Sequence, residues 1–528
     1  MNIKKLVTMI LPVLLGLVVF TLPVQAEEDT FKVAMEAGYA PFNWTQTTDQ
    51  NGAVPIEGSK EFAGGYDVEI AKTIANQLGK KLVIVKTQWD GLPLALTSGK
   101  VDAVIAGMSP TEERRKEIDF SDIYYQSHLV LLVKKGSPYE EATALTDFAD
   151  AKITAQLNTF HYSVIDQIAG VNKQTAMDDF AAMRVALESG VIDGYVTEKP
   201  EALTAENANP NFKLVEFSQA NGFQTEPADT AIAIGLKKDS PLRLEINDIL
   251  AEIPPAEQDK IMKQVIANQP DNNSNEIWVI KILKENGMMF LRGAGMTLFI
   301  SLIGTILGTA IGMAIGVFRT IPTPERKFKR ICYAILNKFF SVYIEIFRGT
   351  PMIVQAMVIY YGSAQAFGID INRTLAALFI VSINTGAYMT EIVRGGIYSV
   401  DKGQSEAAQA IGMTHGQTMR NVVIPQVIRN ILPATGNEFV INIKDTSVLN
   451  VIAVSELFFQ AKSVAGSNYR FFDTFFVVCV IYFIMTFTVT QILRYLERRL
   501  DGPDDYAPYA NQMQVVTPED IKAQQEGL

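Results

Sequence analysis

Residues 405–425 read SEAAQAIGMTHGQTMRNVVIP, and this stretch lies between two strongly apolar segments of the chain. It is rich in small residues and helical in character, but it does not have the pattern of a lipid-facing span. Ser405 can cap a short helix, Glu406 suits the positive end of that helix, and Gly412 can end it. The stretch therefore predicts a separate short helix between two apolar segments.

Three alanines of this stretch, Ala407, Ala408 and Ala410, leave little side chain on the predicted helix. Another protein could therefore approach its backbone closely. From the residues alone, two interpretations stay open. The helix docks a cytoplasmic partner, or it is a re-entrant or amphipathic helix at the membrane surface.

The rest of the 528-residue chain divides into two halves of different composition. Residues 27–275 are polar and acidic, whereas residues 276–528 hold nearly all the long apolar runs and are slightly positive. The formal net charge of the whole chain is −11. Its acidic half argues against nucleic-acid binding, because it would repel phosphates. The length indicates more than one domain.

The N-terminus has the pattern of a signal peptide, residues 1–26. Lys4 and Lys5 precede an apolar run that ends at the small-residue site Val24-Gln25-Ala26. An uncleaved anchor is the alternative, and in either case the following domain is exported. Both cysteines lie in apolar segments further on, so the exported domain is not held together by disulfides.

Short β-rich runs alternate with helical segments over residues 30–240. Helices are predicted at Tyr66–Leu78 and Met177–Glu188. This alternation predicts a parallel sheet covered by helices, with ligands at the carboxyl ends of its strands. The strand candidates are Phe31–Met35, Leu82–Lys86, Ala103–Ala106, Leu129–Val133, Ile153–Gln156 and Ala231–Leu236.

A polar linker, residues 269–284, precedes five predicted membrane spans. In the first span, Gly304, Gly308, Gly312 and Gly316 recur every four residues and predict close helix packing. The five spans are approximately Met288–Phe318, Ile331–Phe367, Leu375–Ile392, Ile431–Val454 and Phe471–Leu493.

The Lys/Arg distribution predicts the orientation of these spans. The basic runs at 319–330 and 494–499 should be cytoplasmic. The exported domain then lies outside a cell membrane that the chain crosses several times. Residues 405–425 and the tail, 501–528, lie in the cytoplasm.

Several motifs resemble the permeases of ABC importers. Glu406-Ala407-Ala408 with Gly412, followed by Val422-Val423-Ile424-Pro425, resembles the EAA loop of that family. EIFRGTPMIVQ (345–355) and NIKDTSVLNVI (442–452) resemble its polar-amino-acid subfamily. The resemblance covers residues 285–500. It implies that Glu406, Ala407, Ala408 and Gly412 couple the permease to a cytoplasmic ATPase.

The exported half resembles amino-acid substrate-binding proteins of the clamshell type, in FKVAMEAGYAPFNW, GGYDVEIAKTIANQLG and AGMSPTEERRKEIDFSDIYY. This implies an α/β two-lobed, periplasmic-binding-protein-like type II domain at residues 27–268. The first lobe would comprise about 27–125 and 225–268, and the second about 126–224. The whole chain would then be a receptor fused to an all-α, five-span permease.

The spacing in GMSPTEER (107–114) predicts Ser109 as a helix N-cap with Pro110 at the first helical position. An ordinary capped surface helix is the alternative from spacing alone. The clamshell resemblance implies instead that Gly107, Ser109 and Arg114 bind the carboxylate of an amino acid. It implies further ligand-site residues, with Glu198 for the ammonium group where the family usually has Asp. These are Glu36, Tyr39, Phe42, Trp89, Asn158, Thr159 and Glu198.

Two acids with aromatic residues favour a basic ligand (lysine, arginine or histidine), and glutamine or another polar amino acid is the alternative. No phosphate-binding loop is present, so a separate chain would bind ATP and Mg²⁺ and hydrolyse the ATP. No cofactor, metal or catalytic site is predicted. Five spans are half of what the family implies, so we expect a homodimer with two ATPases. A ligand-gated channel is a remote alternative, and an exported enzyme is another.

Overall fold

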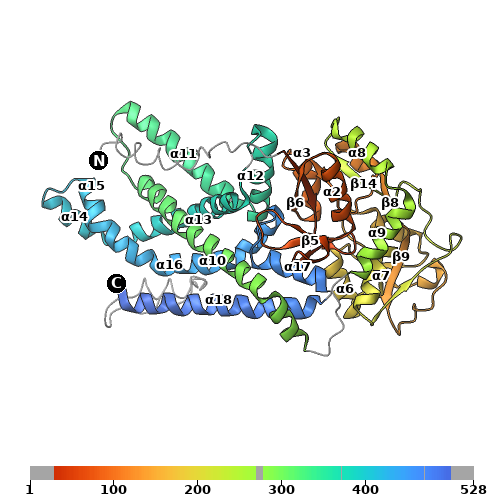
Figure 1. Ribbon diagram of the computed structural model, residues 1–528. Helices are drawn as coiled ribbons and strands as arrows, with labels where there is room; N and C mark the ends of the chain where they lie inside the picture. Colours follow the sequence, from red (N-terminus) through yellow and green to blue (C-terminus); the bar gives the residue numbers. More distant parts are fainter. Residues whose placement is uncertain (1–28, 269–276, 370, 469, 501–528) are drawn as a thin grey trace.

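The structure is a computed structural model, and it describes residues 29–268, 277–369, 371–468 and 470–500. A mixed α/β N-terminal domain lies at one end of the molecule and a long helical domain extends from it (Figure 1). The predicted signal peptide, the predicted tail and residues 269–276 of the predicted linker lie outside the described residues.

The N-terminal domain contains two five-stranded sheets, one in each lobe. Its first sheet has, in spatial order, β6 (Lys81–Lys86), β1 (Thr30–Met35), β7 (Ala103–Val104), β14 (Ala231–Leu236) and β8 (Asp119–Gln126). The helices of this lobe are α2 (Tyr66–Gln77), α3 (Leu92–Thr97), α4 (Glu112–Glu117), α8 (Leu242–Ala251) and α9 (Pro255–Ala267). Most of β1 and all of β14 are buried, as expected for strands covered on both faces.

The second sheet has the order β11 (Asn172–Lys173), β10 (Lys152–Thr154), β12 (Gly194–Glu198), β9 (Leu129–Lys134) and β13 (Phe212–Val215). Its helices are α5 (Phe160–Val164), α6 (Phe180–Glu188) and α7 (Lys199–Ala208). The chain crosses between the lobes after β8 and again between β13 and β14. A small antiparallel sheet beside the first lobe has β2 (Gly38–Tyr39), β3 (Asn43–Gln46), β5 (Phe62–Gly64) and β4 (Val54–Pro55).

The six strand candidates and both helix candidates are confirmed, but the prediction of purely parallel sheets is wrong for one strand in each lobe. In the first sheet β14 runs antiparallel to both of its neighbours, and in the second sheet β9 does so. Each is the strand by which the chain enters its lobe from the other lobe. It therefore starts at the edge where the parallel strands end.

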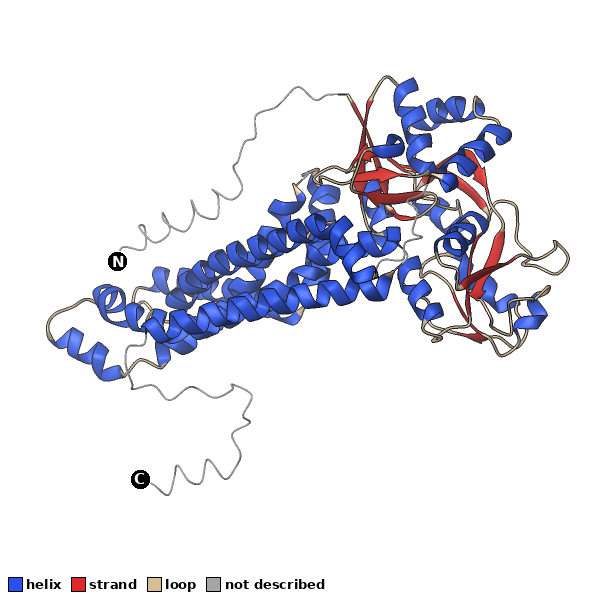
Figure 2. Ribbon diagram, turned by 60° about the horizontal axis from the view of Figure 1, so that its bottom comes forward, coloured by secondary structure: helices blue, strands red, loops and turns tan. Residues whose placement is uncertain are grey.

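The helical domain is an elongated bundle (Figure 2). Its helices are α10 (Trp278–Arg319), α11 (Lys327–Gly349), α12 (Met352–Phe367), α13 (Arg373–Tyr398), α14 (Lys402–Ala410), α15 (His415–Thr418), α16 (Ile424–Asp445), α17 (Leu457–Asn468) and α18 (Phe471–Leu500). Within the described residues, α10, α13 and α18 are long and apolar enough to cross a membrane. The number rises to five if each of two bent helix pairs forms one span.

The bends within these pairs were not predicted from the sequence. The predicted span Ile331–Phe367 is divided into α11 and α12, and the chain bends by 113° between them. Pro351 lies between them, and a proline disfavours helical backbone at the residue before it, here Thr350. The second pair bends by 56° before α17, a helix that the sequence analysis did not predict.

The glycine stripe of the first span is confirmed as a packing surface between α10 and α13. A Cβ atom at Gly308 would lie 2.6 Å from Thr385 Cβ, and one at Gly312 would lie 2.5 Å from Met389 Cβ. Only glycine permits this approach of the two backbones.

Candidate ligand-binding site

A pocket lies between the two lobes, where several strands of both sheets end. Glu198 is the last residue of β12, and Gly107 and Ser109 follow β7. Ligands of open α/β sheets bind at this edge. The residues that line the pocket are Tyr39, Trp89, Gly107, Ser109, Arg114, Gln156, Thr159, Phe160, His161, Phe180 and Glu198.

Arg114 supplies the positive charge of the pocket and links the two lobes. Its guanidinium donates to the carbonyl oxygens of Ser109, at 2.8 Å, and Asn158, at 3.0 Å. The guanidinium carbon also lies 5.2 Å from the centre of the Trp89 ring. Burial lowers the pKa of Arg114 to about 10, so the side chain remains a cation at neutral pH.

The helix that carries Arg114 begins later than predicted. Thr111, not Ser109, is the N-cap of α4, because its hydroxyl accepts from the Arg114 backbone N–H at 3.4 Å. Pro110 therefore precedes the helix. Ser109 lies on the pocket wall and holds the Arg114 guanidinium through its carbonyl oxygen.

Glu198 supplies the negative charge, from the opposite lobe. Its buried carboxylate accepts from the Tyr39 hydroxyl and lies 2.9 Å from His161 Nε2. Burial alone would raise the pKa of Glu198. The attraction of His161 and the two hydrogen bonds outweigh burial and hold this pKa below its ordinary value. Within the described part of the chain, nothing hydrogen-bonds the buried Nδ1 of His161.

Aromatic rings form the remaining wall. The Tyr39 ring is stacked between Phe180, at 4.6 Å between ring centres, and Phe42, at 5.0 Å. Gly107 lies against this stack in left-handed backbone, with φ +62, and a Cβ atom there would lie 2.7 Å from Tyr39 Cε1. A glycine is therefore required both by the conformation and by the contact.

The structure places three of the predicted site residues off the pocket wall. Phe42 is fully buried behind Tyr39, and Asn158 bonds Asp90 at 2.9 Å while its carbonyl holds Arg114. Glu36 is buried beside the first sheet. Burial and the nearby Asp179 raise its pKa to about 7, against the opposing effect of Lys462 and Lys86.

Three ring residues on the wall, Phe160, His161 and Phe180, were missed in the sequence analysis. Phe160 and His161 directly follow the predicted site residue Thr159, and Phe180 lies within the predicted helix Met177–Glu188. A lone histidine or phenylalanine has no pattern of its own, so only this proximity to predicted residues and elements could have indicated them.

The predicted coupling segment, Glu406 to Gly412, lies in and directly after α14, at the end of the helical domain away from the N-terminal domain (Figure 1). Asp401, not Ser405, caps α14, because its side chain accepts from Gly403 N–H at 2.6 Å. Glu406 and Ala407 are exposed, whereas Ala408 is buried against the bundle. Gly412 ends the helix with a φ of +87, as predicted.

Comparison with known proteins identifies both domains. Residues 31–267 match the bacterial extracellular solute-binding proteins, family 3, and residues 333–502 match the binding-protein-dependent transport system inner membrane component. In the described residues, no group of three or more His, Cys, Asp or Glu side chains could hold a metal ion.

The curated relatives include permease proteins of amino-acid transport systems. The glutamine transport system permease protein GlnP of Escherichia coli (strain K12) is 39% identical over 213 residues, which are 40% of this chain and 93% of GlnP. The arginine transport system permease protein ArtQ of Bacillus subtilis (strain 168) is 35% identical over 162 residues, 31% of this chain and 74% of ArtQ.

Among solved structures, the amino acid ABC transporter substrate-binding protein AbpA of Streptococcus pneumoniae, bound to L-arginine, covers 45% of this chain and 95% of its own. Its sequence identity is 26% and its TM-score 0.39. The family matches and the permease relatives indicate a transport protein and not an enzyme. The chain belongs to the amino-acid permeases of binding-protein-dependent ABC importers, and it carries a two-lobed family 3 solute-binding domain fused to its permease domain.

Proposed function

We propose that the pocket captures a polar α-amino acid outside the cell and delivers it to the permease domain. One observation carries this proposal: the wall presents a half-buried cation from one lobe and a buried carboxylate from the other. An α-amino acid presents the complementary pair of charges. Arg114 would hold its carboxylate with two parallel hydrogen bonds, and Glu198 would hold its ammonium group. Buried charges need such partners.

The other predicted residues would support these two. Tyr39 and Trp89 would cover the stem of the ligand side chain, with Phe42 behind Tyr39. Gly107, Ser109 and Thr159 would face the ligand carboxylate, and Asn158 would fix Arg114.

Two ligand classes remain candidates. The sequence favours a basic side chain, held by Glu36. The position of Glu36 is a reason to consider glutamine, because this residue lies off the wall beside Lys86, and a pKa of about 7 leaves it partly protonated at neutral pH. If Glu198 holds the α-ammonium group, the described wall offers no second carboxylate to a cationic side chain. GlnP and ArtQ, named for glutamine and arginine, are compatible with either class.

ATP hydrolysis would take place on a separate subunit, with ATP and Mg²⁺ bound there. Glu406, Ala407, Ala408 and Gly412 would form the contact with that subunit, since this segment lies opposite the binding domain. The binding domain would then be extracellular, and the coupling segment and C-terminus cytoplasmic. Two copies of this chain would form the complete pathway with two ATPases.

Calorimetric titration of the full chain in lipid nanodiscs with each of the twenty amino acids tests the binding function. We expect submicromolar binding of either glutamine or the basic amino acids. Loss of the guanidinium in Arg114→Ala should weaken that binding at least about 100-fold, because two charge-assisted hydrogen bonds are lost.

Arg115→Ala is the matched control. Arg115 follows Arg114 in α4, but it is exposed and donates to the Pro110 carbonyl outside the pocket. The amino-acid affinity of this variant should stay within about twofold of that of the unmodified chain, since no ligand contact is lost. Failure of all twenty amino acids to bind would refute the proposed function. Equal losses in the two variants would refute the role of Arg114.

A further inference from the structure

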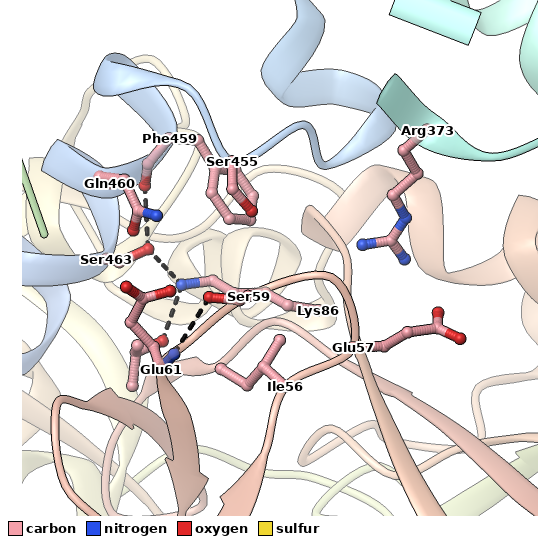
Figure 3. A pocket seen from close by; sticks show the side chains of 11 residues that line it. Ile56, Glu57, Ser59, Glu61, Lys86, Arg373, Ser455, Phe459, Gln460 and Ser463 are labelled. Atoms are coloured by element: carbon pink, nitrogen blue, oxygen red, sulfur yellow. Dashed lines mark hydrogen bonds between the residues drawn. The ribbon is translucent and has the colours of Figure 1, made fainter. Parts of the chain in front are cut away.

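Helix α17 of the permease domain lies against the binding domain, and a small pocket separates the two there (Figure 3). In this view the Lys86 side chain of the first lobe points to Ser463 of α17, and the two are hydrogen-bonded. The Lys86 ammonium also lies 2.7 Å from Thr45 Oγ1 and 4.8 Å from the centre of the Phe459 ring. Lys86 is buried, so this contact is an interface and not a chance surface approach.

Lys462, which also lies in α17, contacts both lobes at once. Its Nζ atom lies 2.9 Å from Oε1 of Gln88, two residues after the end of β6 in the first lobe. The same atom lies 2.9 Å from Asp179 Oδ2, which immediately precedes α6 of the second lobe. Four-fifths of the Lys462 side chain is shielded from solvent.

One ammonium group reaches both acceptors only while the lobes keep their present separation. Hydrogen bonds of this kind extend over about 2.7–3.2 Å, so opening the lobes by a few ångströms would break one of the two. The lobes are held together here by direct bonds across the ligand pocket, from Tyr39 to Glu198 and from Arg114 to Asn158. Lys462 therefore makes its full set of contacts with the closed arrangement alone.

Asp179 also connects this contact with the pocket. It caps α6 by accepting from Ala182 N–H at 2.9 Å, and the first residue of α6 is Phe180, which stacks on Tyr39. A displacement of α6 that follows the ligand would thus move the carboxylate that Lys462 binds.

We propose that Lys462 reports lobe closure to the permease by bridging Gln88 and Asp179. This inference rests on the proposed function, since it assigns a role during amino-acid capture. A permease that binds the closed domain more tightly than the open domain must, by linkage, make ligand and docking favour each other.

Two other ion pairs between the domains provide matched controls, because each contacts a single lobe. Arg292 lies 3.6 Å from Glu61 of the first lobe, and Arg470 lies 3.8 Å from Glu188 of the second. Removing either charge weakens docking of one lobe. Neither pair depends on the separation of the lobes.

The test follows docking through the accessibility of α17 in the full chain in nanodiscs. Cys332 and Cys479 are changed to Ser, and Ser463→Cys introduces one reporter thiol at a buried interface position. Calorimetry on the same samples with each of the twenty amino acids first identifies the one that binds most tightly. Maleimide modification is then timed with and without a saturating concentration of that amino acid. In this reference chain, we expect the bound amino acid to slow modification about tenfold.

Lys462→Gln should reduce this protection to less than about twofold while the chain still binds the amino acid, and Asp179→Asn, which keeps the helix cap, should do the same. Arg292→Gln and Arg470→Gln should accelerate modification by similar factors with and without ligand. The ratio of the modification rate without ligand to the rate with ligand should therefore stay the same. Full protection in Lys462→Gln would overturn the inference and leave the proposed function intact. Absence of binding in the reference chain would overturn both.

Discussion

Arg114 and Glu198 face the pocket from different lobes, so neither lobe alone completes the charge pattern of an amino acid. Their chemistry differs as well. Arg114 keeps its charge despite burial, whereas Glu198 keeps its charge because His161 and Tyr39 compensate the burial. The two residues therefore respond differently to pH.

Acid should selectively remove the contribution of Glu198 to stability. The pKa of its carboxyl lies below the ordinary value of 4.5 in the folded chain, so the unfolded chain binds more protons. The stabilisation is complete above about pH 4.5 and is lost as the pH falls through the folded pKa. The unfolding temperature of the binding domain in the full chain should consequently fall more steeply between pH 6 and 3.5 than that of Glu198→Gln.

The control for this pH profile is Glu216→Gln, which removes a half-exposed carboxylate paired with Lys199. A surface pair contributes little, so its profile should follow that of the unmodified chain. A Glu198→Gln profile as steep as the unmodified one would contradict the assignment.

Gly107→Ala should weaken amino-acid binding through Tyr39. Left-handed backbone disfavours alanine by about 1–2 kcal/mol, and the new methyl group would also press on the Tyr39 ring. Gly99→Ala carries the same backbone cost, with φ +75, but nothing lies within 4 Å of its Cβ position. Both variants should therefore unfold at lower temperature, and only Gly107→Ala should lose affinity in calorimetric titration. Equal affinities would show that the Tyr39 contact is unimportant.

At this scale the sequence predicted most of the pocket wall but not the packing around it. The predicted residues that line the wall are Tyr39, Trp89, Gly107, Ser109, Arg114, Thr159 and Glu198. Glu36 lies off the wall, beside Lys86 and Lys462. These two lysines come from positions far apart in the chain, so the sequence alone did not indicate that they surround Glu36. The N-cap at Ser109 was wrong because Thr111 offers an equivalent hydroxyl two residues later.

Among the elements, α10 and α13 show most directly how sequence determines packing. Gly308→Ala should separate these helices, since its methyl group would lie 2.6 Å from Thr385 Cβ, and such overpacking costs about 1–3 kcal/mol. Gly295→Ala, in the same helix but with open space around its Cβ position, should be neutral or slightly stabilising. The measurement is the thermal midpoint of the purified chain in detergent. Identical midpoints would contradict the role of the stripe.

Helix α17 was not predicted because its signal is local and polar. Glu456 holds the start of the helix, accepting from the backbone N–H groups of Phe458 and Phe459 at 2.8 and 2.7 Å. Hydropathy detects long apolar runs and merges or overlooks such short elements. The break between α11 and α12 was overlooked for the same reason, although Pro351 indicates it locally.

In the whole molecule, one continuous run of chain connects the two ends. It leads from the coupling segment through η5 (Met419–Val423), α16 and η6 (Thr446–Ile452) to α17 at the binding domain. A movement of either end can therefore reach the other through α16, which packs against α10, α13 and α18. This continuity is a physical path, and coupling along it has to be measured.

Ala407→Arg tests the far end of this path. Ala407 is exposed on α14, so a large charged side chain there should leave the fold intact and prevent close approach of an ATPase subunit. ATP hydrolysis by the complex with that subunit should fall at least about tenfold, while amino-acid binding by the full chain remains unchanged. Ala220→Arg, the same substitution at an exposed position of the binding domain, should leave both unchanged.

Undiminished hydrolysis in Ala407→Arg would mean that the ATPase docks elsewhere. Loss of amino-acid binding as well would mean that the effect of the substitution is not confined to the ATPase interface, because α14 and the ligand pocket lie at opposite ends of the molecule.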